Sequence, residues 1–198
     1  MKVRFAVIGS RGLLGTELTS FLAARGHFVS GFDRTNIDIH ALVPEDLALQ
    51  LSGFDVVVNA AGYTRVDAAE TEIYEANAVN AIAAGKLAQA SAQTDARFLQ
   101  VSTDYVFKGD ATEPYLTSEM PDPQTEYGRS KALGELLVSE SGADYSIIRT
   151  AWLYGSAGNC FPKTIANVLD MTGSARVVDD QRGQPTWTRD LAKLILDV

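Results

Sequence analysis

Short apolar runs alternate with stretches of helical periodicity along the first 155 residues. The run VRFAVIG (3–9) is rich in β-branched residues and ends in glycine, as a buried parallel strand does. Residues 13–25 carry apolar side chains at helical spacing, and Gly26 follows as a helix stop. The same alternation of apolar runs and helical periodicity predicts strands at 27–33, 54–62, 97–103 and 145–155, and helices at 44–53, 73–94 and 130–141.

This alternation predicts an α/β fold, a doubly wound parallel sheet of the Rossmann-like type with helices on both faces. After residue 155 the pattern loosens into a helix over 161–173, a strand and loop over 175–188 and a helix over 189–198. We therefore expect a dinucleotide-binding domain over residues 1–155 and a partial substrate-binding portion over residues 156–198. The last apolar periodicity ends without a cap, which we interpret as a truncated chain.

Composition and charge exclude several classes of protein. The 198 residues are 46% hydrophobic and 21% charged, which is ordinary for a soluble globular protein, and the net charge of −8 argues against binding to nucleic acid or an anionic membrane. No apolar run approaches the length of a membrane span. The single Cys160 cannot form an internal disulfide, so we expect a cytoplasmic protein, and with only His27 and His40 beside it we expect no metal cluster.

A glycine-rich turn follows the first strand. Gly9, Gly12 and Gly15 have the spacing G-x-x-G-x-x-G between a strand and a helix, which is the context of a dinucleotide fingerprint. In that interpretation Gly9 permits the tight turn, Gly12 lets the backbone approach a pyrophosphate, and Gly15 lets helix and strand pack closely. A tight turn without a ligand is the alternative when the motif is taken alone.

Opposite charges lie side by side at the end of the second strand. Asp33 comes 24 residues after Gly9, where an acid commonly binds the adenosine ribose hydroxyls and favours NAD. Arg34 follows directly and can instead hold a 2′-phosphate, so the choice between NADPH and NADH stays open. Further cofactor candidates are Asp38 and Ile39, near the adenine, and Ala61, Gly62 and Tyr63, at the small-residue exit of the third strand.

Tyr127 and Lys131 are separated by four positions, so on a helix they share one face. A lysine ammonium beside the phenol would lower the pKa of the tyrosine, which could then exchange a proton with a carbonyl or alcohol oxygen. Such a pair occurs by chance on many helices. It gains weight from the glycine turn and from Thr103, whose hydroxyl should lie at the carboxyl edge of the sheet, with Asp104 facing the substrate.

Six motifs in order resemble the extended short-chain dehydrogenase/reductases, and within them the dTDP-4-dehydrorhamnose reductases. They are VIGSRGLLG, NAAGYTRVDAAE, VSTDYVF, YGRSK, IIRTAWLYG and VVDDQRGQPTW. The resemblance covers nearly the whole chain. It implies an NAD(P)-dependent oxidoreductase that reduces the 4-keto group of dTDP-4-dehydro-L-rhamnose to dTDP-L-rhamnose, in nucleotide-sugar biosynthesis for cell-surface polysaccharides.

The same resemblance implies roles for individual residues. Tyr127 would donate the proton, Lys131 would hold the nicotinamide ribose and tune Tyr127, and Thr103 would assist at the carbonyl. The cofactor would be NADPH or NADH, and the substrate a dTDP-linked keto-sugar, bound by a monomer or homodimer. Some relatives dimerise through magnesium held by glutamates. Glu17 fits one such position, but Arg189 stands where a second acid is expected, so no magnesium site is predicted. The resemblance places Gly12, Leu13, Leu14, Asp38, Ile39, Ala61, Gly62 and Tyr63 on the cofactor, and Asp104 and Trp152 on the sugar nucleotide.

Two alternatives stay open. The first is another nucleotide-sugar enzyme of the same scaffold, an epimerase or a dehydratase. A dehydratase of this family has an Asp-Glu pair after the threonine of the fourth strand, whereas here Asp104 is followed by Tyr105. The second is a non-catalytic regulatory subunit that binds NADP, against which the presence of Thr103, Tyr127 and Lys131 argues.

Overall fold

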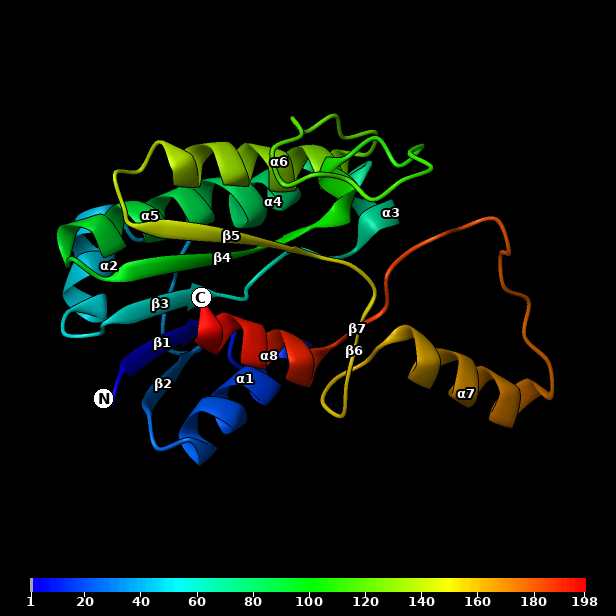
Figure 1. Cartoon of the computed structure of the whole chain (residues 1–198), viewed down its shortest axis with the longest axis horizontal. Coiled ribbons are helices and arrows are strands. Elements are labelled where there is room, and N and C mark those ends of the chain that lie inside the picture. The colour runs from blue at the N-terminus through cyan, green and yellow to red at the C-terminus, as the bar shows by residue number, and fades with distance from the viewer. Residues whose placement is uncertain (1) are drawn as a thin grey trace.

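Five of the predicted apolar runs form strands of one parallel sheet in the computed structural model, which describes residues 2–198 (Figure 1). The strand order is β2-β1-β3-β4-β5, so the chain reverses its direction across the sheet at β1. Open α/β sheets bind ligands at that reversal, outside the carboxyl ends of the strands. The strands are β1 Arg4–Ile8, β2 Phe28–Phe32, β3 Val56–Asn59, β4 Arg97–Thr103 and β5 Tyr145–Thr150.

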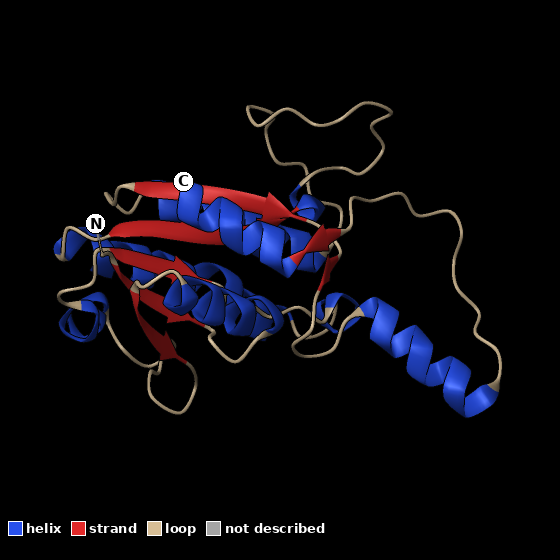
Figure 2. Ribbon diagram, turned by 60° about the horizontal axis from the view of Figure 1, so that its bottom comes forward, coloured by secondary structure: helices blue, strands red, loops and turns tan. Residues whose placement is uncertain are grey.

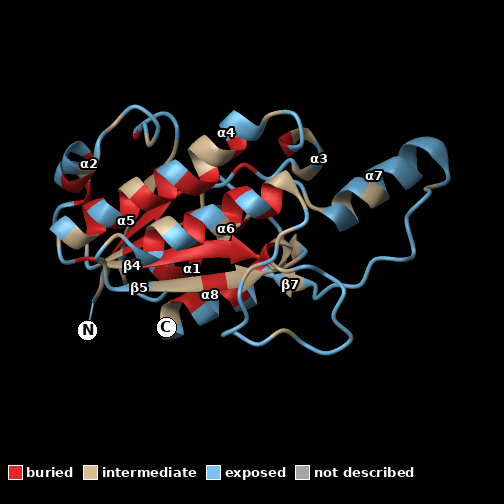
Figure 3. Cartoon of the chain, turned by 90° about the horizontal axis from the view of Figure 1, so that it is seen from above, coloured by how far each residue is buried: buried red, intermediate tan, exposed pale blue. Residues whose placement is uncertain are grey.

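Helices cover both faces of this sheet (Figure 1, Figure 2). Successive strand residues point to opposite faces, so Phe5 and Val7 of β1 join one core cluster, and Ala6 and Ile8 join the other. Figure 3 shows buried residues along the strands and on the inner sides of the helices. The first cluster includes α1 (Leu13–Ala24) and α8 (Thr188–Asp197), and the second includes residues of α2 (Pro44–Leu51), α5 (Ala83–Gln93) and α6 (Glu126–Ser139). The predicted doubly wound fold is confirmed.

The remaining elements are short, apart from α7. They are α3 Val66–Ala69, α4 Ile73–Asn77, the π-helical turn η1 Ala78–Ile82, the 3₁₀ turn η2 Asp104–Val106, β6 Leu153–Tyr154, α7 Phe161–Thr172 and β7 Thr186–Trp187.

The predicted single helix over 73–94 is interrupted by the π-helical turn η1. The buried Asn80 lies in this turn, and its amide group donates to the carbonyl of Tyr63 at 3.0 Å and to the hydroxyl of Ser130 at 2.9 Å. Its amide oxygen accepts the backbone N–H of Tyr63 at 2.9 Å. These bonds link the exit of β3 to α6 through the π turn, where a continuous α-helix was expected.

Helix α6 begins at Glu126, four residues before the apolar run at 130–141 and one residue before Tyr127, which was predicted to share a helix face with Lys131. The hydroxyl of Thr125 accepts the backbone N–H of Gly128 at 3.0 Å and thereby caps the helix. The early start places Tyr127 in the first helical turn, next to the end of β4. The predicted strand over 145–155 ends at Thr150, because Trp152 has a φ of 47° that a strand does not adopt.

The turn between β1 and α1 brings three backbone segments into close contact. Gly9 has a φ of 79°, and a Cβ atom there would lie 2.7 Å from the backbone nitrogen of Ala61. A Cβ on Gly15 would overlap the carbonyl oxygen of Gly9. Only glycine therefore lets β1, α1 and the exit of β3 meet at this edge.

The segment after β5 first leaves the sheet and then returns. Helix α7 extends away from the sheet, whereas α8 packs on α1 through Leu191, Ala192 and Ile195 (Figure 1). The predicted domain boundary after residue 155 stays a prediction. Helix α8, which follows that boundary, packs in the core cluster on one face of the sheet. None of the helices in residues 2–198 combines the length and the apolar character that crossing a membrane requires.

Replacing Phe98 by alanine should destabilise the fold strongly. Phe98, the second residue of β4, is fully buried, and removing such a ring costs about 3–5 kcal/mol through lost burial and the cavity left behind. The matched control is Phe28→Ala on the edge strand β2, where the ring is 59% exposed and the expected loss is about 0.5 kcal/mol. Urea denaturation of both variants measures the difference, and equal losses would contradict the assigned core.

Gly9→Ala should cost far more stability than Gly26→Ala. Both glycines have positive φ, 79° and 81°, so each alanine incurs about 1 kcal/mol of backbone strain. Only the Cβ at position 9 meets neighbouring backbone, since nothing lies within 4 Å of the corresponding point at Gly26. Thermal unfolding should show a clearly lower Tm for Gly9→Ala. If both variants melt together, the close contact with Ala61 is not needed for folding.

Candidate active site

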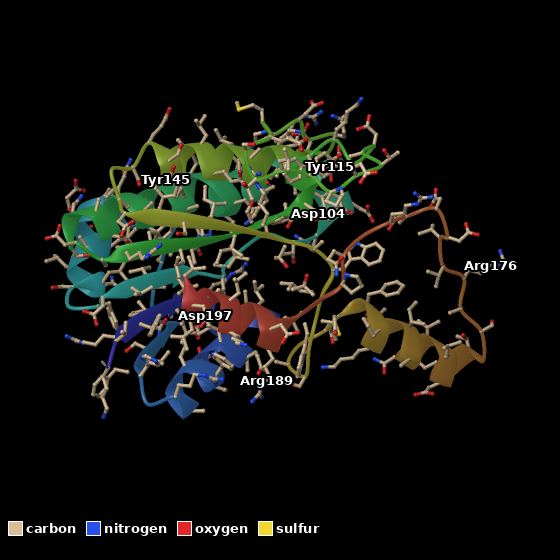
Figure 4. All side chains as sticks on the ribbon, viewed as in Figure 1. Asp104, Tyr115, Tyr145, Arg176, Arg189 and Asp197 are labelled. Atoms are coloured by element: carbon tan, nitrogen blue, oxygen red, sulfur yellow. The ribbon has the colours of Figure 1, made fainter. Side chains whose placement is uncertain are left out.

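A pocket of about 440 Å³ opens at the carboxyl edge of the sheet. Thr103 at the end of β4 and Tyr127 and Lys131 on α6 all line it, so the structure brings the three predicted catalytic side chains together. Asp104 lies at this end of the sheet as well (Figure 4). The other predicted residues that line the pocket are Gly12, Leu13, Leu14, Ala61, Gly62 and Trp152.

Tyr127 and Thr103 lie together in the wall of this pocket. The Thr103 hydroxyl donates to the carboxylate of Asp104 at 3.0 Å and accepts the backbone N–H of Tyr105 at 3.2 Å. Both Tyr127 and Thr103 are buried, at 9% and 6% exposure. The Thr103 hydroxyl is therefore tied to the Asp104 carboxylate in the pocket wall that Tyr127 also lines.

Burial raises the pKa of Tyr127 above its ordinary value, and the charge of Asp104 and the neighbouring Tyr105 add to the rise. The neighbouring Thr103 hydroxyl acts in the opposite direction on this pKa. This contradicts the expectation that Lys131 lowers the pKa of the tyrosine. The phenol is thus held in its protonated form at neutral pH.

The amine of Lys131 is directed at the neighbouring strand. Its Nζ donates to the carbonyl oxygen of Val101 in β4 at 2.7 Å, and Lys131 is not among the groups that shift the pKa of Tyr127. Burial lowers the pKa of Lys131 to about 8, and the carboxylate of Glu135 opposes that shift. The lysine therefore changes its charge within a few pH units of neutrality.

Glu135, which the sequence analysis did not single out, is buried beside these groups with 6% exposure. Its carboxylate accepts hydrogen bonds from the Ser102 hydroxyl at 2.5 Å and from Arg149 Nε and Nη2 at 3.0 and 2.6 Å. The spacing of Tyr127, Lys131 and Glu135 at i, i+4 and i+8 was the available signal. The partners on β4 and β5 could not be inferred from spacing.

A second pocket, of about 360 Å³, lies at the reversal of the strand order. It is lined by the ends of β1, β2 and β3, as a dinucleotide site in this fold requires. The carboxylate of Asp33 lies 2.7 Å from Arg11 Nε and accepts both the backbone N–H and the hydroxyl of Thr35. The hydrogen bonds from Thr35 lower the pKa of Asp33, and Arg11 adds to this effect. The predicted residues on this pocket are Gly9, Gly12, Asp33, Arg34, Ile39, Ala61 and Gly62.

Arg11 is a pocket residue that the sequence analysis missed. It lies within the glycine turn, directly before Gly12, and pairs with the carboxylate of Asp33 in the pocket that Arg34 also lines. A basic residue between the first two glycines was the available signal. Its partner on the next strand only follows from the fold.

Three predicted cofactor residues lie elsewhere. Asp38 accepts the backbone N–H groups of His40 and Ala41 at 3.0 Å each and stabilises its own turn. The Tyr63 hydroxyl donates to Glu72 at 2.8 Å. Gly15 packs against the turn at Gly9. None of the three borders either of these two pockets within residues 2–198, and their cofactor contacts stay predictions.

Trp152 stands at the mouth of the catalytic pocket with 45% exposure. The positive φ of Trp152 turns the chain away from the line of β5. The backbone of Gly183 lies so close to the Trp152 ring that a Cβ atom on Gly183 would overlap the ring. The loop before β7 therefore lies against the side chain that was predicted to meet the sugar nucleotide.

Glu17 and Arg189, at the place where no magnesium site was predicted, form an ion pair. Arg189 Nη1 lies 3.6 Å from the carboxylate of Glu17. Within residues 2–198 no three metal-binding side chains gather. The expectation that the protein uses no metal stays a prediction.

The residues at the two pockets fit a dinucleotide cofactor. The glycine turn presents bare backbone, and among the described residues no side chain caps the N-terminus of α1 and no acid occupies its first turn. A helix N-terminus in that state favours a phosphate. The two pockets share Gly12, Ala60, Ala61 and Gly62, so an extended ligand would reach from Asp33 to Lys131.

Comparison with known proteins gives consistent matches over almost the whole chain. The spore coat polysaccharide biosynthesis protein SpsK of Bacillus subtilis is 38% identical over 190 residues, which cover 96% of this chain and 67% of that protein. A dTDP-4-dehydrorhamnose reductase of Streptomyces griseus is 43% identical over 190 residues, covering 96% of this chain and 62% of the relative.

The crystal structure of a dTDP-4-dehydrorhamnose reductase from Bacillus anthracis in complex with NADP superposes with a TM-score of 0.93 at 37% identity, covering 100% of this chain and 70% of that one. The chain thus spans about two thirds of the length of the relatives it matches. The profile of the RmlD substrate binding domain family matches residues 3–198. The chain therefore belongs to the RmlD substrate binding domain family.

Proposed function

We propose that the protein reduces the 4-keto group of dTDP-4-dehydro-L-rhamnose to dTDP-L-rhamnose with a nicotinamide cofactor. The observation that carries the proposal is the meeting of Thr103, Tyr127 and Lys131 in one pocket that adjoins the glycine turn. Relatives that are 37–43% identical and named dTDP-4-dehydrorhamnose reductase support the choice of substrate.

Tyr127 is the proposed proton donor. Reduction of a ketone adds a proton to the oxygen that becomes the alcohol, so the donor must begin protonated. The raised pKa of Tyr127 supplies that state at neutral pH. Thr103 lines the same pocket and would bring a second hydroxyl to the same oxygen.

The cofactor supplies the hydride when bound. Gly9, Gly12 and the N-terminus of α1 would hold its pyrophosphate, and Asp33 with Arg11 and Arg34 would contact the adenosine ribose. Lys131 would contact the nicotinamide ribose, and the shared rim of the two pockets supports this extended pose. The relative from Bacillus anthracis that was solved with NADP favours NADPH.

Elimination chemistry is less well supported. The position after Asp104, where a dehydratase needs a further acid, is occupied by Tyr105. The ring of Tyr105 packs edge-on against Tyr127, with 5.5 Å between the ring centroids. This residue therefore shields the proposed proton donor and supplies no base.

The setting of the reaction belongs to the same proposal. The chain has the single Cys160, so it forms no internal disulfide and suits the cytoplasm. We also propose that residues 1–155 bind the dinucleotide and that part of residues 156–198 serves the sugar nucleotide. A monomer or homodimer remains the expected assembly.

Tyr127→Phe should abolish most of the keto-sugar-dependent oxidation of NADPH. Loss of a positioned general acid lowers kcat by about 10²- to 10⁴-fold, while NADPH binding should change little because the ring is kept. The assay follows the absorbance of reduced nicotinamide with dTDP-4-dehydro-L-rhamnose. The control is Tyr74→Phe, at an 81% exposed ring, which should keep full turnover. Normal turnover by Tyr127→Phe would disprove the assignment.

Asp33→Asn should shift cofactor preference towards NADPH. The amide can still accept hydrogen bonds from Thr35, but the negative charge that repels a 2′-phosphate is gone, so the ratio of the two Kd values should change by about tenfold. Arg34→Gln should move the ratio in the opposite direction. Fluorescence titration with NADPH and NADH measures both variants. An unchanged ratio in both would place the 2′-hydroxyl elsewhere.

A further inference from the structure

We propose that Glu135 is a positioning residue of this site, which ties the helix face bearing Tyr127 and Lys131 to the ends of β4 and β5. The inference rests on the proposed function and adds to it a residue that touches neither substrate nor cofactor.

The geometry begins with the spacing on α6. Tyr127, Lys131 and Glu135 follow one another at intervals of four residues, so they lie on one face of the helix, and all three are at most 9% exposed. The first two line the catalytic pocket. Glu135 lies one turn further along and is the member of this row that contacts both neighbouring strands.

The strand register shows what those contacts hold. Ser102 of β4 pairs with Arg149 of β5, and both donate to the carboxylate of Glu135. The next register pair is Thr103 with Thr150, and both of these residues line the pocket. The Glu135 carboxylate therefore holds the residue pair Ser102–Arg149 in place. This pair directly precedes Thr103–Thr150, the pair that lines the pocket.

The carboxylate also compensates the buried amine of Lys131. Apart from Glu135, the charged and titratable groups around these residues are Arg149 from β5 and Asp104 and Tyr105 from η2. Asp104 and Tyr105 act on Tyr127, and Arg149 is paired with Glu135 at 2.6 Å. The charge that favours the ammonium form of Lys131 is that of Glu135.

The test is the pH dependence of Glu135→Gln, which keeps the shape and removes the charge. Without the carboxylate, the pKa of Lys131 should fall from about 8 by about one unit, so the ammonium is lost at lower pH. In this proposal turnover requires the ammonium form of Lys131, which contacts the nicotinamide ribose. The fall in kcat relative to the unaltered chain should then grow from about twofold near pH 7 to about ninefold near pH 9. A purely structural role would lower kcat by one factor at every pH.

Two further variants separate charge from packing. Glu135→Asp keeps the charge at a shorter reach, so it should lower the Tm but move the alkaline limb of the profile less than Glu135→Gln does. Glu140→Gln, at the exposed end of the same helix, should change neither Tm nor profile. If Glu135→Gln does not fold, the alkaline limb of Glu135→Asp decides between the two roles. A smaller shift of this limb supports the positioning role, and a fall in kcat by one factor at every pH supports a purely structural role.

A direct readout does not depend on turnover. NMR of chains with ¹³C-labelled lysine, with the Lys131 signal assigned from Lys131→Met, should show Lys131 titrating near 8 and lower in the Glu135 variants. The inference is overturned if every Glu135 variant that folds keeps both the Lys131 titration and the alkaline limb of the kcat profile unchanged. Absence of keto-sugar-dependent NADPH oxidation by the unaltered chain would instead overturn the proposed function, while the lysine titration still tests Glu135.

Discussion

A buried amine links helix α6 to strand β4, and the geometry of the candidate site depends on it. Lys131 donates to the Val101 carbonyl while Glu135, one turn away, supplies the opposite charge. A buried charge without such partners would cost several kcal/mol. Because the amine and the carboxylate both contact β4, the first turn of α6 is fixed beside Thr103. That is where Tyr127 and the strand end meet.

The opposite side of the site depends on backbone contact. At Gly9 the chain passes so close to Ala61 that no side chain fits, which brings the glycine turn of β1 next to the exit of β3. The two pockets are joined there through Gly12, Ala60, Ala61 and Gly62. A ligand that spans them would have its charged end near Arg11 and Asp33 and its reacting end near Tyr127.

The sheet and its covering helices could be predicted because their apolar periods are strong and separated by glycine. The turn at Gly9 and the Tyr127–Lys131 face were accessible for the same reason, since both are local patterns. Thr125 could have marked the true start of α6, because a threonine before an acid is a common cap. The interruption at Asn80 could not be predicted, since its hydrogen bonds reach Tyr63 and Ser130, far away in the sequence.

Contacts between strands were likewise beyond sequence patterns. Glu135 meets Ser102 and Arg149 only because β4 and β5 pair in one register. The expected effect of Lys131 on the pKa of Tyr127 failed for a related reason, because spacing places the amine on the right face but does not say that it points at the backbone of Val101.

The most direct test of the central claim is hydride transfer itself. NADPH that carries deuterium at both C4 positions of the nicotinamide is incubated with the protein and dTDP-4-dehydro-L-rhamnose, and the sugar product is analysed by mass spectrometry. The account predicts a product that carries one deuterium on C4, formed in proportion to the NADPH consumed. A product without deuterium, or cofactor binding with no conversion of the sugar, would contradict it.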